Sequence, residues 1–372
     1  MKQFTIPEGM RDVILGECEV RKSLQQKIES CLDGWGYEEV ITPTIEFYKT
    51  YEEGFDNINE QDMYKFFDAQ GRILMLRADM TIPIARVVAT KFKDVKPPLR
   101  FRYCANVFKV HEELSGLKNE ISDCGVELIG VDEKCGDLEI LSTAMDALKV
   151  VEDKKWVLEI GNINYFTEAC NRIGLAQKDR EELARLINEK SLKELDEKLE
   201  TLQLEEKYKV FFKQLPWLSG DVNILKQAES YVFCDALKNI LNNLTQLYTD
   251  LKALGYEDIQ FDLGKTSNLN YYTGIIFEAF VEGVGTRVLS GGRYDSLIEK
   301  YGRKLPAIGF SIKLDALVEV AEKVKVKKGT LIRYGAQNRV EAILKGRELR
   351  KIGKVKMQED NDVNGICIEE EA

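Results

Sequence analysis

Histidine is almost absent from this sequence, since His111 is the one histidine among 372 residues. A metal centre built on several histidines is therefore excluded. The chain also lacks any run of about 18 uncharged apolar residues, which a membrane-spanning helix needs. Its first residues show neither the basic nor the apolar segment of an export signal. We therefore expect a cytoplasmic protein that does not enter a membrane.

Cysteine is present but is not arranged in pairs. No C-x-x-C pair occurs, and the eight cysteines lie singly at positions 18, 31, 104, 124, 135, 170, 234 and 367. Such spacing suggests neither a zinc site nor a disulfide framework. We expect small core residues in a reducing compartment, and we predict no metal or other cofactor.

Positive charge is in the minority. The chain has 53 lysines and arginines against 63 acidic residues, which gives a formal charge of −10. The long-range field of such a protein repels phosphate backbones, so nucleic acid is a disfavoured partner. The length and the hydrophobic content of 44% are sufficient for two or three domains with a buried core.

The hydrophobic pattern predicts two strand-rich regions separated by a helical one. β-branched and alternating segments predict strands before residue 163 and again after residue 260, whereas leucines three or four apart predict helices from about 164 to 255. Pro43 interrupts the first strand and favours a strand end or an edge. Strands grouped around a helical insertion indicate an α+β fold with a largely antiparallel sheet.

A lysine-rich junction divides the chain near its C-terminal end. We expect a core of residues 1–322, which includes the helical insertion, and a truncated α/β segment of residues 323–372. The segment reads strand, helix, strand, strand, but its length is close to the limit of about 40 residues below which a chain seldom folds unaided. We expect it to dock on another surface.

Six segments, in order, carry a resemblance to a known family. They are PEGMRD (7–12), GYEEVITPTIE (36–46), LRADMT (76–81), VFKVHEELSGLKNEISDCGVELIG (107–130), NLNYYTGIIFE (268–278) and LSGGRYDSLIEKYGRKLPAIGFSIKLDAL (289–317). Together they resemble the class II aminoacyl-tRNA synthetase core, specifically histidyl-tRNA synthetase and its paralogue, the regulatory subunit of ATP phosphoribosyltransferase. One short string would be weak support, whereas six in order are strong. The resemblance implies an antiparallel sheet flanked by helices and a homodimer formed through this core.

The ATP half of the resembled site is not preserved. Synthetases carry phosphate-binding arginines at several motif positions, because a guanidinium fork matches phosphate geometry and neutralises developing charge. The residues at those positions here are Lys109, Leu117, Asn119, Ser267 and Ala316. We infer that the chain does not form an adenylate and is not an enzyme.

The amino-acid half is better preserved. By the resemblance, the residues that line a histidine pocket are Asp79, Thr81, Asp123, Glu127, Tyr271, Tyr272 and Tyr294, with Asp123 where a glutamine is usual. The carboxylates of Asp79 and Asp123 suit an α-ammonium group, while Glu127 and a tyrosine hydroxyl suit the two imidazole nitrogens. Lys109 is the cation that remains for the ligand carboxylate.

Each of these residues also has a structural interpretation. Strand alternation would turn the rings of Tyr271 and Tyr272 to opposite faces unless the preceding loop distorts the pleat, and it favours Tyr272 as the ligand residue. Asp79 can cap the helix that follows it. Glu127 can lie on a solvated strand face. Arg293 can pair with an acid instead of a ligand.

The resemblance therefore implies a regulatory subunit without its own catalytic activity. Such a subunit assembles with a short catalytic ATP phosphoribosyltransferase subunit, is needed for its activity, and transmits feedback inhibition by L-histidine in the first step of histidine biosynthesis. The C-terminal segment is also shorter than the roughly one hundred residues of an anticodon-binding domain. Two alternatives remain open: a divergent histidyl-tRNA synthetase-like enzyme that activates an amino acid, and a free-standing histidine sensor.

Overall fold

The chain divides into two compact units, Met1–Ala321 and Glu322–Ala372. The computed structural model describes residues 4–54, 60–111, 116–151, 153–266, 271–321 and 329–370. The larger unit contains every residue predicted for the histidine pocket. Ser267, which was predicted to stand in place of a catalytic arginine, lies outside the described residues.

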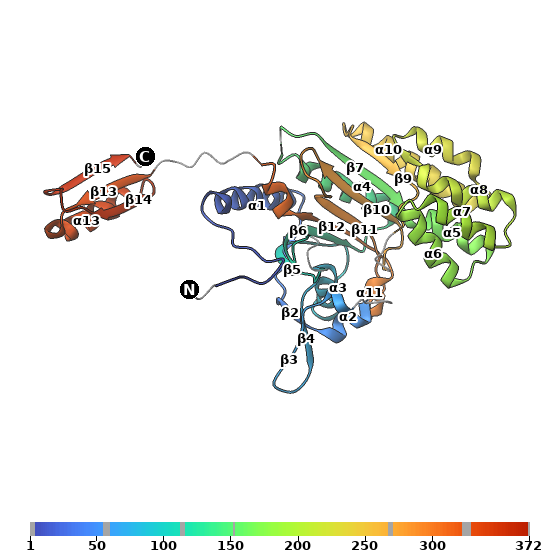
Figure 1. Ribbon diagram of the computed structural model, residues 1–372, viewed down its shortest axis with the longest axis horizontal. Coiled ribbons are helices and arrows are strands. Elements are labelled where there is room, and N and C mark those ends of the chain that lie inside the picture. The colour runs from blue at the N-terminus through green and yellow to red at the C-terminus, as the bar shows by residue number, and fades with distance from the viewer. Residues whose placement is uncertain are drawn as a thin grey trace. The chain divides into compact units, whose positions relative to one another are not determined.

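A sheet forms the centre of the larger unit (Figure 1). Within the described residues its nine strands are, in spatial order, β1 (Glu38–Glu39), β5 (Leu99–Phe108), β6 (Glu120–Ile129), β12 (Ala307–Lys313), β11 (Leu289–Arg293), β10 (Ile275–Val281), β7 (Trp156–Asn162), β9 (Ile259–Asp262) and β8 (Ser219–Gly220). Neighbouring strands pair antiparallel except that β1 pairs with β5, and β7 with β9, in parallel. The predicted α+β fold with a largely antiparallel sheet is confirmed. The strand interrupted at Pro43 contributes the edge strand β1, as predicted.

Helices α1 (Gly16–Gly34) and α4 (Glu133–Leu148) pack on one face of this sheet. Strand alternation explains the packing, because every second residue of a strand faces the same side. In β6 the residues on this side are Cys124, Val126 and Leu128, all fully buried. Burial of each large apolar side chain stabilises the fold by roughly 1.5 to 3 kcal/mol.

The opposite face of the sheet is partly polar. The intervening residues of β6, which are Asp123, Gly125 and Glu127, point to this side. A second, smaller core covers part of it, built by β5 together with α2 (Tyr48–Gly54), α3 (Thr81–Thr90) and α11 (Leu297–Lys300). The candidate site lies on this face.

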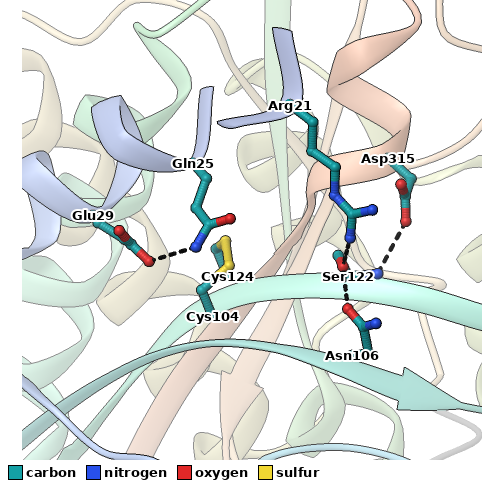
Figure 2. The surroundings of a disulfide bond; sticks show 8 residues. All are labelled: Arg21, Gln25, Glu29, Cys104, Asn106, Ser122, Cys124 and Asp315. Atoms are coloured by element: carbon teal, nitrogen blue, oxygen red, sulfur yellow. Dashed lines mark hydrogen bonds between the residues drawn. A yellow bond between two sulfur atoms is a disulfide. The ribbon is translucent and has the colours of Figure 1, made fainter. Parts of the chain in front are cut away.

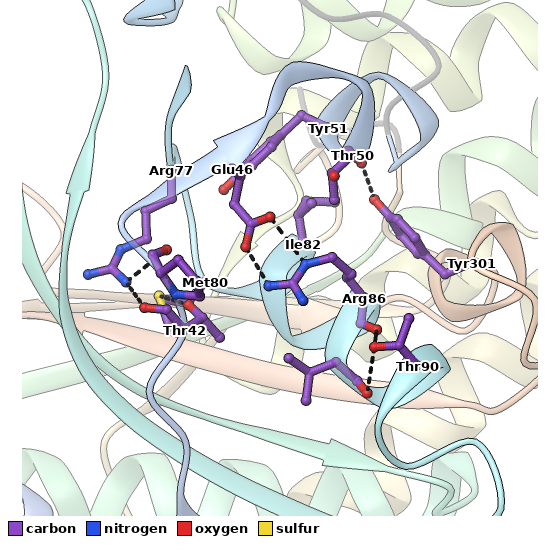
Figure 3. A network of polar contacts seen from close by, with 12 residues as sticks. Thr42, Glu46, Thr50, Tyr51, Arg77, Met80, Ile82, Arg86, Thr90 and Tyr301 are labelled. Carbon is purple, nitrogen blue, oxygen red and sulfur yellow. Dashed lines mark hydrogen bonds and ion pairs between the residues drawn. The ribbon is translucent and has the colours of Figure 1, made fainter. Parts of the chain in front are cut away.

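A small antiparallel sheet adjoins α2 and α3. Its strands are, in spatial order, β2 (Ile45–Phe47), β4 (Ile73–Leu76) and β3 (Lys65–Phe67). The short helix η1 (Glu60–Asp62) precedes β3 along the chain. Arg86 of α3 forms two hydrogen bonds, of 3.1 and 2.5 Å, with the buried Glu46 (Figure 3). Arg77 donates a bond of 2.9 Å to the carbonyl of Thr42. The first contact holds β2 against α3, and the second holds the chain beside Pro43 against the segment that follows β4.

The chain between β7 and β9 is mainly helical. Its elements are α5 (Ile163–Ile173), α6 (Gln177–Asn188), α7 (Leu192–Thr201), α8 (Glu206–Gln214), η2 (Leu215–Trp217), β8, α9 (Asn223–Ala228), η3 (Glu229–Tyr231) and α10 (Asp235–Ala253). The leucines that predicted helices are buried, as Leu237, Leu241 and Leu244 of α10 show. In the described part of the chain, none of the helices combines the length and the apolar character that crossing a membrane requires. Helix α12 (Leu314–Val318) follows β12 and is the last helix of the larger unit.

The smaller unit has the predicted order of strand, helix, strand, strand. Its elements are β13 (Thr330–Tyr334), η4 (Ala336–Asn338), α13 (Arg339–Leu349), β14 (Val355–Glu359) and β15 (Ile366–Glu370). The central strand β13 pairs with β14 in parallel and with β15 antiparallel. Among the described residues of this unit, the fully buried apolar side chains are Ile332 and Ala342. The core of the smaller unit is therefore small.

The expectation that no cysteines are paired is wrong at one place. Cys104 and Cys124 form a disulfide across β5 and β6 (Figure 2). The strand register sets the two residues directly opposite each other, with their Cα atoms 4.1 Å apart. Their separation of 20 residues contains no signal of this pairing, because the register depends on the loop and on the burial of both strands. The other six cysteines are free.

Candidate functional site

Glu127 lies at the centre of the polar sheet face and is 1% exposed. Thr81 Oγ1 donates a hydrogen bond of 2.8 Å to one carboxylate oxygen, and the Tyr294 hydroxyl donates to the other. Gly309 stands opposite on β12, where a Cβ atom would come within 1.8 Å of this carboxylate. Burial raises the pKa of Glu127 to about 8, although Tyr294 and Thr81 act to lower it and Asp79 raises it further. The carboxyl group is therefore fixed in place, and its protonated form is favoured more than in an exposed glutamate.

Three tyrosine rings surround this carboxyl group. The ring centroids of Tyr271 and Tyr272 are 4.9 Å apart, and those of Tyr271 and Tyr294 are 6.0 Å apart, both in edge-to-face contact. Tyr272 lies over Gly292, where a Cβ atom would come within 2.7 Å of its ring. Burial, and after it the charge of Glu127, raises the pKa of the Tyr272 hydroxyl. Both adjacent tyrosines thus lie close to the same carboxyl group.

The expectation that strand alternation would separate the two adjacent tyrosine rings, unless the preceding loop distorted the pleat, does not apply to these residues. That expectation applied strand alternation to residues 271 and 272, but β10 begins at Ile275. The backbone before that residue does not follow the pleat, so the alternation has no force there.

Asp79 precedes α3 and holds its first turn. Its Oδ1 accepts a hydrogen bond of 2.9 Å from the backbone N–H of Ile82, which confirms the predicted capping role. The Tyr51 hydroxyl donates to the Asp79 backbone carbonyl at 3.0 Å. Burial raises the pKa of Asp79, while the Ile82 N–H and the charge of Lys109 lower it. The side chain therefore caps the helix and faces the same polar space as Lys109.

Asp123 lies on β6, four residues before Glu127 and on the same face of the strand. Its Oδ1 is buried and has no hydrogen-bond partner in the part of the chain that the structure describes. Burial raises the pKa of Asp123 to about 6, and the charges of Lys109 and Lys313 and a hydrogen bond from Ser311 oppose this. The structure thus brings together all eight residues predicted from the resemblance on one sheet face, although their role in binding remains a prediction.

Two further residues of this face were missed. Tyr103 of β5 is buried, and the charges of Glu127, Asp123 and Asp79 add to burial in raising the pKa of its hydroxyl. Lys313 ends β12 directly opposite Asp123. The alternation of LRFRYCANVF could have indicated that Tyr103 faces inward, but no sequence signal pairs β12 with β6.

The positions that lack the expected arginines have other structural contacts. Asn119 is buried, and its amide donates to the carbonyl of Glu8 at 3.2 Å and to the hydroxyl of Tyr64 at 2.9 Å. It therefore fastens the N-terminal segment to the site. Ala316 packs against the main core, and Leu117 is half exposed.

Arg293, from the GGRYD segment, has a structural role, as one of its two interpretations predicted. It is 1% exposed and forms ion pairs with Asp137 at 2.6 Å and with Asp295 at 3.0 Å. Burial raises the pKa of Asp137 to about 7, and the charge of Arg293 opposes the rise. This arginine joins β11 to α4, and its guanidinium group is already paired with two carboxylates.

A hollow in the described part of the chain lies away from these residues. It has a volume of about 560 Å³ and is lined by Phe47, Tyr48, Lys49, Thr50, Glu52, Glu53, Arg72, Ile73, Arg86 and Tyr301. None of these is a predicted site residue, and the hollow is wide open to solvent. Over the described ranges, no three histidine, cysteine or acidic side chains are grouped to hold a metal ion.

Comparisons with known proteins first define the class. The sequence model of the family described as histidyl-tRNA synthetase matches residues 9–317. A histidyl-tRNA synthetase structure from Nostoc sp. PCC 7120, at 18% identity, matches with a TM-score of 0.78 over 96% of this chain and 86% of that chain. The large sheet flanked by helices is thus the histidyl-tRNA synthetase-like class II fold.

More similar relatives narrow this class. The chain is 37% identical to the ATP phosphoribosyltransferase regulatory subunit of Acetivibrio thermocellus, over 96% of this chain and 87% of that relative. It is 35% identical to the protein of the same name from Clostridium botulinum strain Langeland, over 86% and 76%. A crystal structure from Bacillus halodurans described as an ATP phosphoribosyltransferase regulatory subunit/histidyl-tRNA synthetase is 32% identical, with a TM-score of 0.87 over 97% and 94% of the two chains. The chain belongs to the family of ATP phosphoribosyltransferase regulatory subunits.

Proposed function

We propose that this chain acts in the cytoplasm with a separate catalytic subunit of ATP phosphoribosyltransferase, which it activates, and that it has no catalytic activity of its own. The reaction served transfers the phosphoribosyl group of phosphoribosyl pyrophosphate to ATP, giving phosphoribosyl-ATP and pyrophosphate, and is the first step of histidine biosynthesis. Family membership supports this role. The observation that carries the ligand assignment is Glu127, a buried carboxyl group that Thr81 and Tyr294 fix beside a pair of tyrosine rings.

L-Histidine is the proposed effector. Glu127 and a tyrosine hydroxyl can bond the two imidazole nitrogens, because a carboxyl group near its pKa can either donate or accept a proton. Asp79 and Asp123 supply negative charge for the α-ammonium group. The tyrosine rings offer an apolar, amphipathic wall to the imidazole ring.

The absence of catalysis is supported by the side chains that replace the arginines. Lys109 is a point charge and does not offer the bidentate fork that suits a phosphate. Asn119 is engaged with the N-terminal segment, and Arg293 is engaged with two acids. Removing one preorganised donor from a transition state typically reduces a rate about 100- to 1000-fold, and several are replaced here.

A homodimer through the larger unit is supported by an exposed apolar surface. The exposed apolar side chains of the small sheet are Ile45, Phe47 and Phe66 on one face and Phe67 and Ile73 on the other, and Ile41 is exposed in the segment before it. Exposed apolar surface of this kind, on the face of the small sheet that carries Ile45, Phe47 and Phe66, marks an interaction site in a folded protein. A second copy of the chain is the proposed occupant.

The decisive experiment mixes the purified chain with a short catalytic ATP phosphoribosyltransferase subunit and measures phosphoribosyl-ATP formation. We expect activation by the chain, and inhibition of the mixture by L-histidine. A coupling free energy of about 1 to 3 kcal/mol corresponds to a change of roughly five- to 150-fold. An unchanged rate in both comparisons would refute the proposal. ATP–pyrophosphate exchange with L-histidine separates the enzyme alternative, since rapid exchange would contradict a non-catalytic role.

A further inference from the structure

Three charged groups lie next to one another on the polar sheet face without ion-pair partners. They are Lys109, Asp123 and Lys313, which we call the unpaired trio. In the described part of the chain neither lysine side chain forms a hydrogen bond or an ion pair within 4 Å, and the Oδ1 atom of Asp123 is buried without a partner. Lys109 and Lys313 are nevertheless the two cations whose charge acts on Asp123.

The strand register places the trio. Lys313 of β12 is the Cα partner of Asp123 on β6, so the two side chains project from the same face. Ile308, Phe310 and Ile312 of β12 fill the core on the other side, which confirms the direction of Lys313. Lys109 follows β5 on the face of its buried residue Val107, and it approaches Asp123 from the opposite flank.

All three residues are partly buried, and a partly buried charge without a partner is held at a free-energy cost, so three such groups in one place require an explanation. The trio has two positive groups and one negative group at short range. An amino acid carries the complementary set, an α-carboxylate and an α-ammonium group separated by one carbon. A zwitterion of this kind would satisfy all three side chains at once.

We infer that Lys313, together with Lys109, binds the α-carboxylate of the amino-acid ligand while Asp123 binds its α-ammonium group. This inference rests on the proposed function, and it adds a residue to which the resemblance assigned no role in the pocket. Lys313 therefore acts as a specificity residue for ligands that retain a free carboxylate. Amino-acid derivatives without that group lose the interaction.

The test is a cycle of two ligands and two proteins, measured by isothermal titration calorimetry on the full chain. The ligands are L-histidine and L-histidinamide, which keeps the imidazole and the ammonium group but has a neutral amide in place of the carboxylate. The variant is Lys313→Met, with Lys193→Met, an exposed lysine of α7, as the matched control. We expect Lys313→Met to weaken L-histidine binding by at least about tenfold and L-histidinamide binding by less than about twofold.

The outcomes separate this inference from the proposed function. If wild-type protein binds L-histidine but Lys313→Met weakens both ligands equally, or neither, the carboxylate assignment is wrong and the histidine pocket stands. If wild-type protein binds neither ligand, the pocket itself is wrong. Circular dichroism establishes that each variant is folded, and Lys313→Arg, which keeps the charge, should retain more L-histidine affinity than Lys313→Met.

Discussion

The polar face of the main sheet carries two groups of charged side chains, and they differ in whether the charges are paired. The unpaired trio lies over β6 and β12. The paired cluster lies further along the same face and consists of Glu159, Lys265, Glu278 and Arg287. Lys265 pairs with Glu159 and, at 2.7 Å, with Glu278, which also pairs with Arg287 at 2.7 Å. A continuous register from Gly125 through β12 and β11 to Glu278 and Glu159 places both groups on one face.

The two partly buried lysines of these groups show the consequence. Burial alone lowers the pKa of an amine, but Glu278 and Glu159 raise the pKa of Lys265 above its ordinary value. Burial and the charge of Arg287 lower the pKa of Lys313, and Asp123 does not compensate. The paired cluster therefore favours the charged form of its lysine, whereas the trio holds its lysine at a free-energy penalty.

This difference distinguishes a structural role from a ligand-binding role. A closed set of ion pairs satisfies its members and stabilises the native sheet, so it has no capacity left for a ligand. A cluster of nearby charges that form no ion pairs destabilises the free protein, and its members gain partners when a ligand binds. The comparison also explains Glu278, the acid within the apolar run GIIFEAF, as a member of the paired cluster.

The largest expected effect concerns Glu127, a buried acid that has no cation beside it among the described residues. Its pKa is raised from 4.5 to about 8, so the native protein holds a proton that the unfolded chain releases between these pH values. The stabilisation is complete below about pH 4.5 and is lost as pH rises to about 8. Relative to Glu127→Gln, the wild type should lose on the order of 4 kcal/mol of unfolding free energy between pH 5 and pH 9.

Urea unfolding at both pH values, followed by tryptophan fluorescence, measures this loss. The three tryptophans, Trp35, Trp156 and Trp217, all report on the larger unit. Glu206→Gln, which changes an exposed acid of α8, is the matched control and should keep the pH dependence of the wild type. An identical pH dependence for wild type and Glu127→Gln would show that this carboxyl group is ionised in the folded protein.

A smaller effect tests the comparison directly. Lys265→Met leaves Glu159 and Glu278 without their shared cation, and both carboxylates are 19% exposed. We expect a loss of about 2 kcal/mol in the free energy of unfolding, less than for a fully buried pair because of this exposure. Lys313→Met removes an unsatisfied charge and should leave the stability of the free protein unchanged or raise it. Equal losses in the two variants, measured by urea unfolding at pH 7.5, would remove the distinction between the groups.

Local patterns predicted much of the fold. Alternation in the segment DCGVELI is sufficient to predict which residues of β6 enter the core, and leucine spacing is sufficient for α10. The disulfide between Cys104 and Cys124 could not be predicted, since it depends on a strand register that is set by long-range packing. Strand alternation was applied to Tyr271 and Tyr272, but both residues precede the start of β10 at Ile275. The ends of a strand are the part that a sequence pattern locates least well.

The site shows the same division. The resemblance was sufficient to select Asp79, Thr81, Glu127 and Tyr294, which the structure places in contact or close to one another. It could not select Lys313, because that residue meets Asp123 only through the pairing of strands about 190 residues apart along the chain. Charges that act across a sheet are therefore the part of a site that the sequence alone conceals.

The smallest expected effect concerns His111, which lies beside the unpaired trio and could be mistaken for its third cation. Burial and the charges of Lys109 and Lys313 lower its pKa, so the imidazole is neutral at pH 7.5 and provides no positive charge. We expect His111→Gln to change the affinity for L-histidine, measured by calorimetry at pH 7.5, by less than about twofold. A loss of about tenfold would mean that the imidazole itself contacts the ligand. The trio would then include a neutral donor, and the contrast between paired and unpaired charge would no longer identify the carboxylate site.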